Sequence, residues 1–245
     1  MKTATIIQAR MSSTRLPGKI MLPLKGKPVL QNITERIRTA KNINDVIIAT
    51  SNESSDDIVE NFCVKAGIKV FRGSLNNVLE RYYECAVKES ADVIVRCTAD
   101  NALIDGNIIA EAVEVFSSGG VDYLSYKEGL PLGMHVEVFS FDALEKSYRE
   151  AKDPECLEHV TPYMIKNPEK FRVLFFRDEN DPDNSSMRFT MDTPEDYEFV
   201  KRVYDSFGSN IFSYGEILQV LSSHSELLAI NQNIHQNVLH YSGEK

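Results

Sequence analysis

The chain has 245 residues, 42% of them hydrophobic and 26% charged, which is enough for one large α/β domain with a proper core. Its formal net charge of −9 argues against a general binder of nucleic acid or of anionic membranes, because such proteins need a basic face. We expect a cytoplasmic protein, because no run reaches membrane-spanning length and no charged segment with a long apolar run precedes the first strand. Four scattered cysteines without a CxxC pair indicate core residues in a reducing compartment, not a zinc site or a disulfide framework: Cys63, Cys85, Cys97 and Cys156.

Strand-like apolar runs alternate with helical patterns through the first half of the chain. The strand-like runs span 4–7, 46–49, 68–71 and 92–96. The helical patterns span 29–40, 55–66, 75–88 and 107–116, and Pro28 suits the first turn of the first helix. This β-α-β-α order predicts an α/β fold of the Rossmann-like kind, with a mostly parallel sheet and helices on both faces.

The first strand breaks abruptly into a loop that carries three hydroxyl side chains and three cations, Arg10, Arg15 and Lys19. Such crowded cations repel one another unless they are solvated or share an anion. Backbone N–H groups, hydroxyls and cations at the end of a buried parallel strand are typical of an anion site. Charge alone also allows a basic surface loop.

Two further strand ends carry polar groups. The third strand ends at Arg72-Gly73-Ser74, where the glycine would let a ligand approach the backbone, although Ser74 also suits a helix N-cap. The fourth strand ends before Thr98-Ala99-Asp100. A carboxylate there needs a cation or an arginine, and Mg²⁺ suits it, since that ion takes one or two carboxylates plus phosphate oxygens. A turn or N-cap role for Asp100 is the alternative, whereas Asp105 suits the cap of the next helix.

The pattern changes after a Ser-Ser-Gly-Gly run at 117–120. Strands are expected at 121–124, 134–139 and 187–191, and helices at 141–151, 154–166, 197–207, 214–224 and 227–241. Thr193-Pro-Glu-Asp is a good helix start, so its acidic residues need no functional explanation. Asp192 lies before that cap, so its carboxylate is not needed to start the helix.

The run Gln8-Ala-Arg-Met-Ser-Ser-Thr-Arg-Leu-Pro-Gly-Lys19 resembles the nucleotide-binding loop of cytidylyltransferases that activate acidic sugars. The resemblance is to the spore-coat-polysaccharide-type branch and, more distantly, to the CMP-Kdo and CMP-sialate synthetases. The stretch from Thr98 to Asp105 is similar to the family's first metal element, and Asp192 stands where the family has its second metal-facing carboxylate. The resemblance covers about residues 1–205.

The resemblance implies transfer of CMP from CTP to an acidic sugar, sialate-like or Kdo-like, with release of pyrophosphate. It implies Mg²⁺ on Asp100 and Asp192 as the cofactor. The residues that it makes catalytic are Arg10, Lys19 and Asp100. Those that it makes nucleotide-binding are Gln8, Ala9, Arg10, Ser13, Arg15, Lys19, Arg72, Thr98, Ala99 and Asp100.

The same resemblance organises the rest of the chain. It implies a nucleotidyltransferase domain over 1–207, in which 120–190 holds the acceptor sugar and contributes to a homodimer contact. His135 and Glu137 are the expected sugar-binding residues of that subregion. Beyond the resemblance, residues 208–245 would form a helical C-terminal extension, because 214–224 and 227–241 have helical apolar spacing.

Other classes of function leave different marks in a sequence. A GT-A-like glycosyltransferase would need an Asp-x-Asp metal motif at a strand end, and Asp181-Pro-Asp183 has that spelling but lies in a polar, turn-rich stretch. Another sugar-phosphate nucleotidyltransferase also remains open. The missing Gly-x-Gly-x-x-Gly and P-loop patterns argue against a dehydrogenase and a P-loop NTPase. A non-catalytic nucleotide-binding protein would tolerate the loss of one metal carboxylate, but Asp100 and Asp192 are both present.

Overall fold

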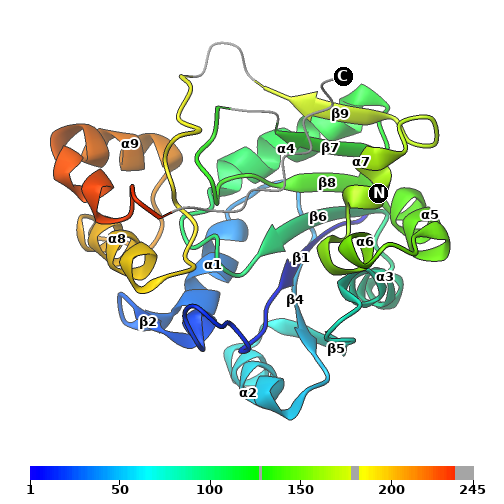
Figure 1. Cartoon of the computed structure of the whole chain (residues 1–245), viewed down its shortest axis with the longest axis horizontal. Helices are drawn as coiled ribbons and strands as arrows, with labels where there is room; N and C mark the ends of the chain where they lie inside the picture. The colour runs from blue at the N-terminus through cyan, green and yellow to red at the C-terminus, as the bar shows by residue number, and fades with distance from the viewer. Residues whose placement is uncertain (127–128, 178–181, 235–245) are drawn as a thin grey trace.

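The computed structural model of the chain describes residues 1–126, 129–177 and 182–234. In these residues seven strands form one sheet, in the order β5-β4-β1-β6-β8-β7-β9, and helices cover it (Figure 1). Its strands are β1 (Thr3–Gln8), β4 (Asp45–Ser51), β5 (Lys69–Gly73), β6 (Val93–Thr98), β7 (Tyr123–Tyr126), β8 (Glu137–Ser140) and β9 (Val173–Phe176). A separate two-stranded sheet joins β2 (Pro23–Leu24) and β3 (Lys27–Pro28).

The prediction of a mostly parallel sheet is confirmed. Among the seven described strands, β8 alone runs against its neighbours: it pairs antiparallel with β6 and β7, whereas every other pairing is parallel. The carboxyl ends of β1, β4, β5 and β6 therefore meet at one edge of the sheet, which is where open α/β sheets bind ligands.

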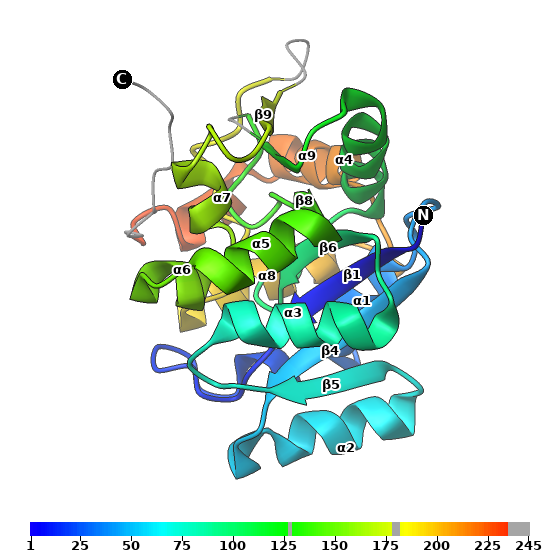
Figure 2. The same ribbon diagram turned by 90° about the vertical axis from the view of Figure 1, so that its right-hand side faces the viewer.

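Two hydrophobic layers sandwich the sheet, because successive side chains of a strand point to opposite faces. Ile6 packs in the cluster under α3 and α5, together with Tyr82, and Ile7 packs in the cluster under α1 and α4. Figure 2 shows α3, α5 and α6 in front of the sheet. The helices are α1 (Val29–Ile37), α2 (Asp57–Ala66), α3 (Val78–Glu89), α4 (Gly106–Gly119), α5 (Phe141–Glu150), α6 (Pro154–His159), α7 (Pro162–Lys166), α8 (Pro194–Asp205) and α9 (Tyr214–Ser223).

Three predicted elements of the second half are corrected. The helix expected at 154–166 is divided into α6 and α7, because Pro162 lacks the N–H that would continue the helix and Val160 adopts a positive φ of 74°. The strand expected at 187–191 does not form, and its one ladder contact is an isolated bridge between Leu132 and Arg188. The strand expected at 134–139 begins only at Glu137, so His135 lies in the preceding loop.

One of the helix caps expected from the sequence is confirmed, and two residues near helix starts lie elsewhere than expected. Asp105 caps α4 as expected, and its side chain accepts from the Asn107 N–H at 2.8 Å. The cap of α3 is Asn77 instead of Ser74, whose hydroxyl accepts from the Asn77 N–H. Pro28 lies immediately before α1 instead of inside its first turn.

The chain after α9 is not the long helix that its spacing predicted. A short 3-10 helix, η3 (Ser225–Ile230), follows α9 and packs on α8. The rest of the predicted helix, 235–241, lies outside the described residues.

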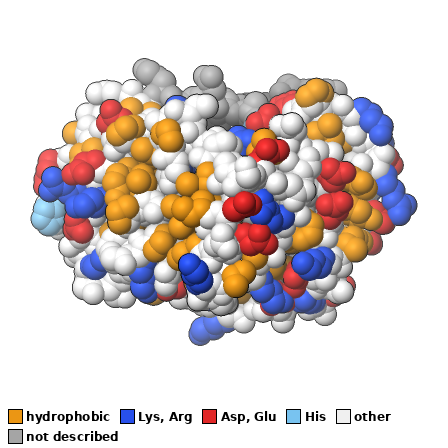
Figure 3. Space-filling model, turned by 90° about the horizontal axis from the view of Figure 1, so that it is seen from below, with side chains coloured by type: hydrophobic (Ala, Val, Ile, Leu, Met, Phe, Trp, Pro, Cys, Tyr) orange, Lys and Arg blue, Asp and Glu red, His pale blue; other side chains and the backbone are white. Residues whose placement is uncertain are grey.

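The surface mixes charges of both signs. On the face shown in Figure 3, acidic and basic side chains lie beside one another, with hydrophobic side chains gathered between them. Among the described residues, no helix is both long enough and apolar enough to cross a membrane.

Candidate active site

The loop after β1 begins at the ligand-binding edge of the sheet. Its first residue is tied to the neighbouring strand by the Ala9 N–H, which donates to the Ala49 carbonyl at 3.1 Å. The Met11 N–H then donates to the carboxylate of Asp56, which is 1% exposed, at 2.8 Å. The loop closes where the Gly18 N–H donates to the Met11 carbonyl, with Gly18 at a φ of 66° that favours glycine. Lys19 follows directly and opens a short 3-10 helix, η1 (Lys19–Met21).

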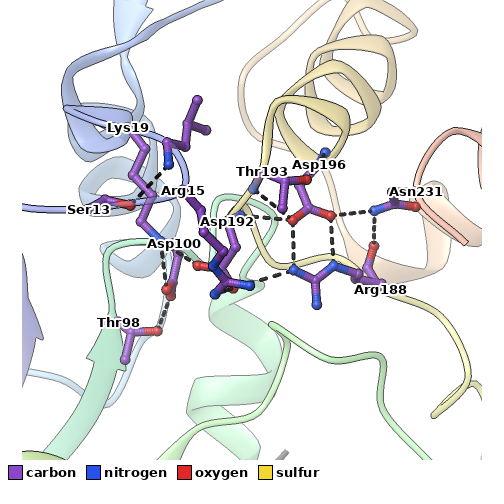
Figure 4. A network of polar contacts seen from close by, with 11 residues as sticks. Ser13, Arg15, Lys19, Thr98, Asp100, Arg188, Asp192, Thr193, Asp196 and Asn231 are labelled. Atoms are coloured by element: carbon purple, nitrogen blue, oxygen red, sulfur yellow. Dashed lines mark hydrogen bonds and ion pairs between the residues drawn. The ribbon is translucent and has the colours of Figure 1, made fainter. Parts of the chain in front are cut away.

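Lys19 lies between the two carboxylates that the sequence nominated for a metal. Its ammonium contacts Asp100 Oδ2 at 3.0 Å and Asp192 Oδ1 at 2.7 Å, and only 8% of the residue is exposed (Figure 4). A backbone hydrogen bond holds the two segments together, because the Met191 N–H donates to the Asp100 carbonyl at 2.9 Å. The structure therefore brings Lys19, Asp100 and Asp192 to one point.

The electrostatics of this cluster favour the charged forms of Lys19 and Asp100. Burial alone would lower the pKa of Lys19, but Asp100 and Asp192 outweigh it and raise that pKa above its usual value. Burial alone would raise the pKa of Asp100, but the Lys19 charge and a hydrogen bond from the Thr98 hydroxyl lower it. The cation that a carboxylate at this strand end was expected to need is supplied by Lys19, which pairs with both Asp100 and Asp192.

The other loop residues differ in how far they join this cluster. Arg15 reaches Asp192 Oδ2 at 3.1 Å, and the Ser13 hydroxyl accepts from the Leu16 N–H at 3.4 Å within the loop (Figure 4). Arg10 is exposed and makes no hydrogen bond or ion pair with any part of the chain that the structure describes.

Arg72 lies at the end of β5 and is engaged away from the cluster. Its guanidinium pairs with Asp57 at 2.6 Å and with Glu60 at 2.8 Å, and it also donates to the carbonyls of Ser51 and Glu53. A nucleotide-binding role for Arg72 remains a prediction that would require it to leave these partners.

Gln8 and Glu137 belong to a second polar group on the α3 side of the sheet. Arg96 and Glu137 face each other across the β6–β8 ladder and form a largely buried ion pair, with side chains 14% and 16% exposed. Each Glu137 oxygen is engaged, one by Arg96 and the other by the hydroxyls of Tyr123 and Thr161, both at 2.6 Å. Arg96 also donates to the Gln8 side-chain oxygen at 3.2 Å.

The pKa values in this second group follow from burial and pairing. Burial alone would raise the pKa of Glu137, but Arg96 and the two hydroxyls lower it. His135, the other expected sugar contact, does not join the group: its Nε2 lies 3.1 Å from the Leu130 carbonyl, and burial lowers the pKa of its ring.

Sequence reasoning missed the residues that hold the site in place. Asp56 and Arg96 act through contacts between different strands and loops, for which the sequence carries no local pattern. Arg188 forms a buried pair with Asp196, with Nε and NH2 each 2.7 Å from one carboxylate oxygen. Asp196 was interpreted only as a first-turn residue; the Thr193 capping box that motivated this does form, but the carboxylate has these further partners.

The geometry first defines a class of protein. A closed loop of cations at the carboxyl edge of a mostly parallel sheet, facing two carboxylates on neighbouring segments, is a site for a phosphate-bearing ligand in an α/β enzyme. Of the Asp-x-Asp pair that a glycosyltransferase would need, only Asp183 is described, and it makes no contact with Lys19, Asp100 or Asp192. Asp183 is exposed and caps a local turn at Ser185, and Asp181 lies outside the described residues.

Comparisons with known proteins then fix the family. The family model described as cytidylyltransferase matches residues 4–231, so the chain belongs to the cytidylyltransferase family and is a nucleotidyltransferase. The spore coat polysaccharide biosynthesis protein SpsF of Bacillus subtilis is 37% identical over 208 residues, which are 83% of this chain and 86% of that protein. The 3-deoxy-manno-octulosonate cytidylyltransferase of Geobacter metallireducens is 34% identical over 113 residues, 46% of this chain and 44% of that protein. The structure of a cytidylyltransferase from Leptospira borgpetersenii is 36% identical with a TM-score of 0.88, covering 98% of this chain and all of that one.

Proposed function

We propose that this protein transfers CMP from CTP to an acidic sugar of the ulosonate type, sialate-like or Kdo-like, and releases pyrophosphate. The observation that carries the proposal is the convergence of Lys19, Asp100 and Asp192 beside the cationic loop. The family supports CTP as the donor, and the octulosonate named for the Geobacter relative supports an acidic acceptor. SpsF supports a place in the synthesis of a surface polysaccharide.

In this reaction a hydroxyl oxygen of the sugar attacks the α-phosphorus of CTP in line. The new O–P bond forms, the bond from the α-phosphorus to the bridging oxygen breaks, the hydroxyl proton is released, and pyrophosphate leaves. Such phosphoryl-group chemistry depends mostly on positioning and on neutralising charge.

The loop cations would bind the triphosphate. Arg10 is available as it stands, because it has no partner among the described residues. Arg15 and Lys19 would exchange one or both of their carboxylate partners for phosphate oxygens. A charge-assisted hydrogen bond of this kind contributes about 1.5–3 kcal/mol.

Asp100 and Asp192 fit Mg²⁺, because that ion is commonly held by one or two carboxylates together with phosphate oxygens and water. The carboxylate oxygens that would hold it are those now facing Lys19. When bound, Mg²⁺ would neutralise charge on the attacking and leaving oxygens. The Thr98 hydroxyl keeps Asp100 oriented, and Arg188 lies 3.4 Å from Asp192 on the side away from Lys19.

The acceptor would lie beside the Arg96–Glu137 pair, with β8 and its preceding loop around it. Glu137 is 16% exposed at its side chain and accepts three hydrogen bonds, which leaves its carboxylate room to accept one more from a sugar hydroxyl, while the carboxylate of the sugar would point away from it. His135 would contribute from the loop before β8.

We also propose a homodimer and a cytoplasmic location. The exposed edge strand β9 supports the dimer, since its four residues are all half-buried and apolar, and such edges are usually covered. Four free cysteines, all buried, are consistent with a reducing compartment.

Pyrophosphate release tests the donor and the acceptor together. Each common nucleoside triphosphate would be combined with a panel of ulosonates and of sugar 1-phosphates, with Mg²⁺ present. We expect release with CTP and an acidic sugar, and not with ATP, GTP or UTP. Release with UTP and a sugar 1-phosphate would instead make the protein another sugar-phosphate nucleotidyltransferase, which is the second candidate.

A further inference from the structure

The carboxylate of Asp196 is a buried hub behind the site. It is fully buried, and it accepts from Arg188 Nε and NH2, both at 2.7 Å. It also accepts from the backbone N–H groups of Asp192 at 2.9 Å and Thr193 at 3.0 Å. These contacts fix the backbone that carries the Asp192 side chain, while Arg188 NH2 lies 3.4 Å from Asp192 Oδ2.

The remaining donor to this hub comes from the C-terminal segment. Asn231 follows η3 and is 3% exposed, and its side-chain amide donates to Asp196 Oδ1 and to the Arg188 carbonyl, both at 3.0 Å. Figure 4 shows Asn231, Asp196, Arg188 and Asp192 as one connected chain of polar contacts. The amide therefore touches both partners of the buried pair that faces Asp192.

We propose that Asn231 is a positioning residue for Asp192, and that the segment from α9 to Asn231 is part of the scaffold of the active site. This inference rests on the proposed metal role of Asp192. The amide acts in two ways: it satisfies a lone pair of a fully buried carboxylate, and it fixes the Arg188 backbone whose side chain meets the same carboxylate. Without the Asn231 amide, the Arg188–Asp196 pair can rearrange. The Asp192 side chain would then move as well, because the Asp196 carboxylate holds the Asp192 backbone N–H.

Two substitutions separate this role from general packing. Asn231→Ala removes one of the two donors to Asp196 Oδ1, so that among the described residues Arg188 Nε alone remains on that oxygen, and it removes the side-chain donor to the Arg188 carbonyl. Asn231→Asp keeps the size of the side chain but places a second carboxylate beside Asp196, so we expect it to be the more damaging change. The matched control is Asn32→Ala: Asn32 is fully buried and its amide donates to two carbonyls, Leu24 and Pro28, with no link to the carboxylates.

The test measures metal binding without turnover. Mn²⁺ binding in the presence of CTP, with no acceptor sugar, would be followed by the loss of the free-ion paramagnetic resonance signal at a temperature well below every melting point. We expect Asn231→Ala to weaken Mn²⁺ binding about fivefold, which corresponds to about 1 kcal/mol, the typical net contribution of one hydrogen bond. Asn32→Ala should lower the melting temperature and leave Mn²⁺ binding unchanged. Wild-type affinity in Asn231→Ala, or an equal loss in Asn32→Ala, would overturn the inference.

A third variant and a crystal structure keep this inference distinct from the proposed function. If Asp192→Asn binds Mn²⁺ as the wild type does, then Asp192 is no metal ligand and the metal role itself fails. The position of the carboxylate is measured independently in a ligand-free crystal structure of Asn231→Ala, where we expect the 2.7 Å contact between Asp192 and Lys19 to lengthen or break. An unchanged contact would overturn the positioning role even if the metal role stood.

Discussion

At the scale of single residues, Lys19 and Arg10 differ although both belong to the same loop. Lys19 is buried between two carboxylates, whereas Arg10 is exposed and has no partner among the described residues. A basic surface loop, which charge alone also allowed, would make both of them exposed cations that contribute little to stability. For Lys19 that assumption is wrong, because removing one member of a buried charge cluster leaves the others uncompensated.

We therefore expect Lys19→Met to destabilise the protein at neutral pH by about 1–3 kcal/mol, besides reducing triphosphate use. Mg²⁺ without nucleotide should raise the melting temperature of this variant more than that of the wild type, because the ammonium no longer lies against the two carboxylates. Differential scanning fluorimetry with and without Mg²⁺ measures both effects. Lys27→Met is the control, since Lys27 pairs with Glu35 at the surface and should contribute less than about 1 kcal/mol. Equal responses to Mg²⁺ in the two variants would contradict this account.

The pH dependence of that stability difference has a fixed sign. The raised pKa of Lys19 gives a contribution that is complete below its unfolded value of about 10.4 and is lost as the pH rises through the folded pKa. The lowered pKa of Asp100 gives a second contribution to stability, which is complete above the unfolded pKa of about 3.9 and is lost as the pH falls through the folded pKa. Denaturant titrations of wild type and Lys19→Met should differ most between about pH 5 and 9 and converge toward both extremes. A difference that grew in acid would contradict the pairing.

For Arg10→Ala we expect a loss of activity without a loss of stability, unlike Lys19→Met. The melting temperature should not change, because exposed cations contribute little. The value of kcat/KM for CTP should fall about ten- to a hundredfold, the cost of one charge-assisted phosphate contact. Steady-state kinetics beside a melting curve provide the check, and normal turnover would remove Arg10 from the site.

At the scale of secondary-structure elements, two helix ends offer a mirrored pair of substitutions. The C-cap of α3 is Ser90, with a left-handed φ of 50°, and the C-cap of α2 is Gly67, with a φ of 65°. Non-glycine residues adopt this conformation at a cost, so Ser90→Gly should stabilise the protein by about 0.5–1 kcal/mol. Gly67→Ala should destabilise it by a similar amount, since an added Cβ would meet nothing within 4 Å and only the backbone would be strained. Chemical denaturation measures both, and opposite signs are required.

The antiparallel pairing of β6 with β8 places Arg96 opposite Glu137, and this pair should be sensitive to mutation. Glu137→Gln would leave the largely buried Arg96 without its charged partner, and we expect the free energy of unfolding to fall by about 1–3 kcal/mol. Because the pKa of Glu137 is lowered, the wild type should lose this advantage as the pH falls through that pKa. Glu35→Gln on α1, at the surface, is the control with an expected loss below about 1 kcal/mol. Equal losses in the two variants would refute the importance of the buried pair.

At the scale of the whole molecule, the sheet ends at β9 with an apolar edge. If a second copy covers it, sedimentation equilibrium should give twice the mass of the chain at the concentrations used for activity. A monomer under those conditions would contradict the dimer and leave the edge of β9 to another explanation.

The sequence by itself determined the parts of this protein that depend on local patterns. The alternation of apolar strands and amphipathic helices predicted the mostly parallel sheet, because each element must bury one face or both. The run from Gln8 to Lys19 identified the loop and its family resemblance, and Thr193-Pro-Glu-Asp predicted the start of α8. These are short-range features, and neighbours in the chain decide them.

The tertiary structure alone decided which distant groups meet. Lys19 lies 81 residues from Asp100 and 173 from Asp192 in the sequence, and no local pattern indicates that its ammonium lies between them. The strand register sets Arg96 against Glu137, and the return of the C-terminal segment sets Asn231 against Asp196. The helix expected at 154–166 failed at Pro162, and the one expected at 227–241 is a 3-10 helix over its first described turns. Apolar spacing cannot report these outcomes, because burial against other elements, and not periodicity, selects the backbone that forms.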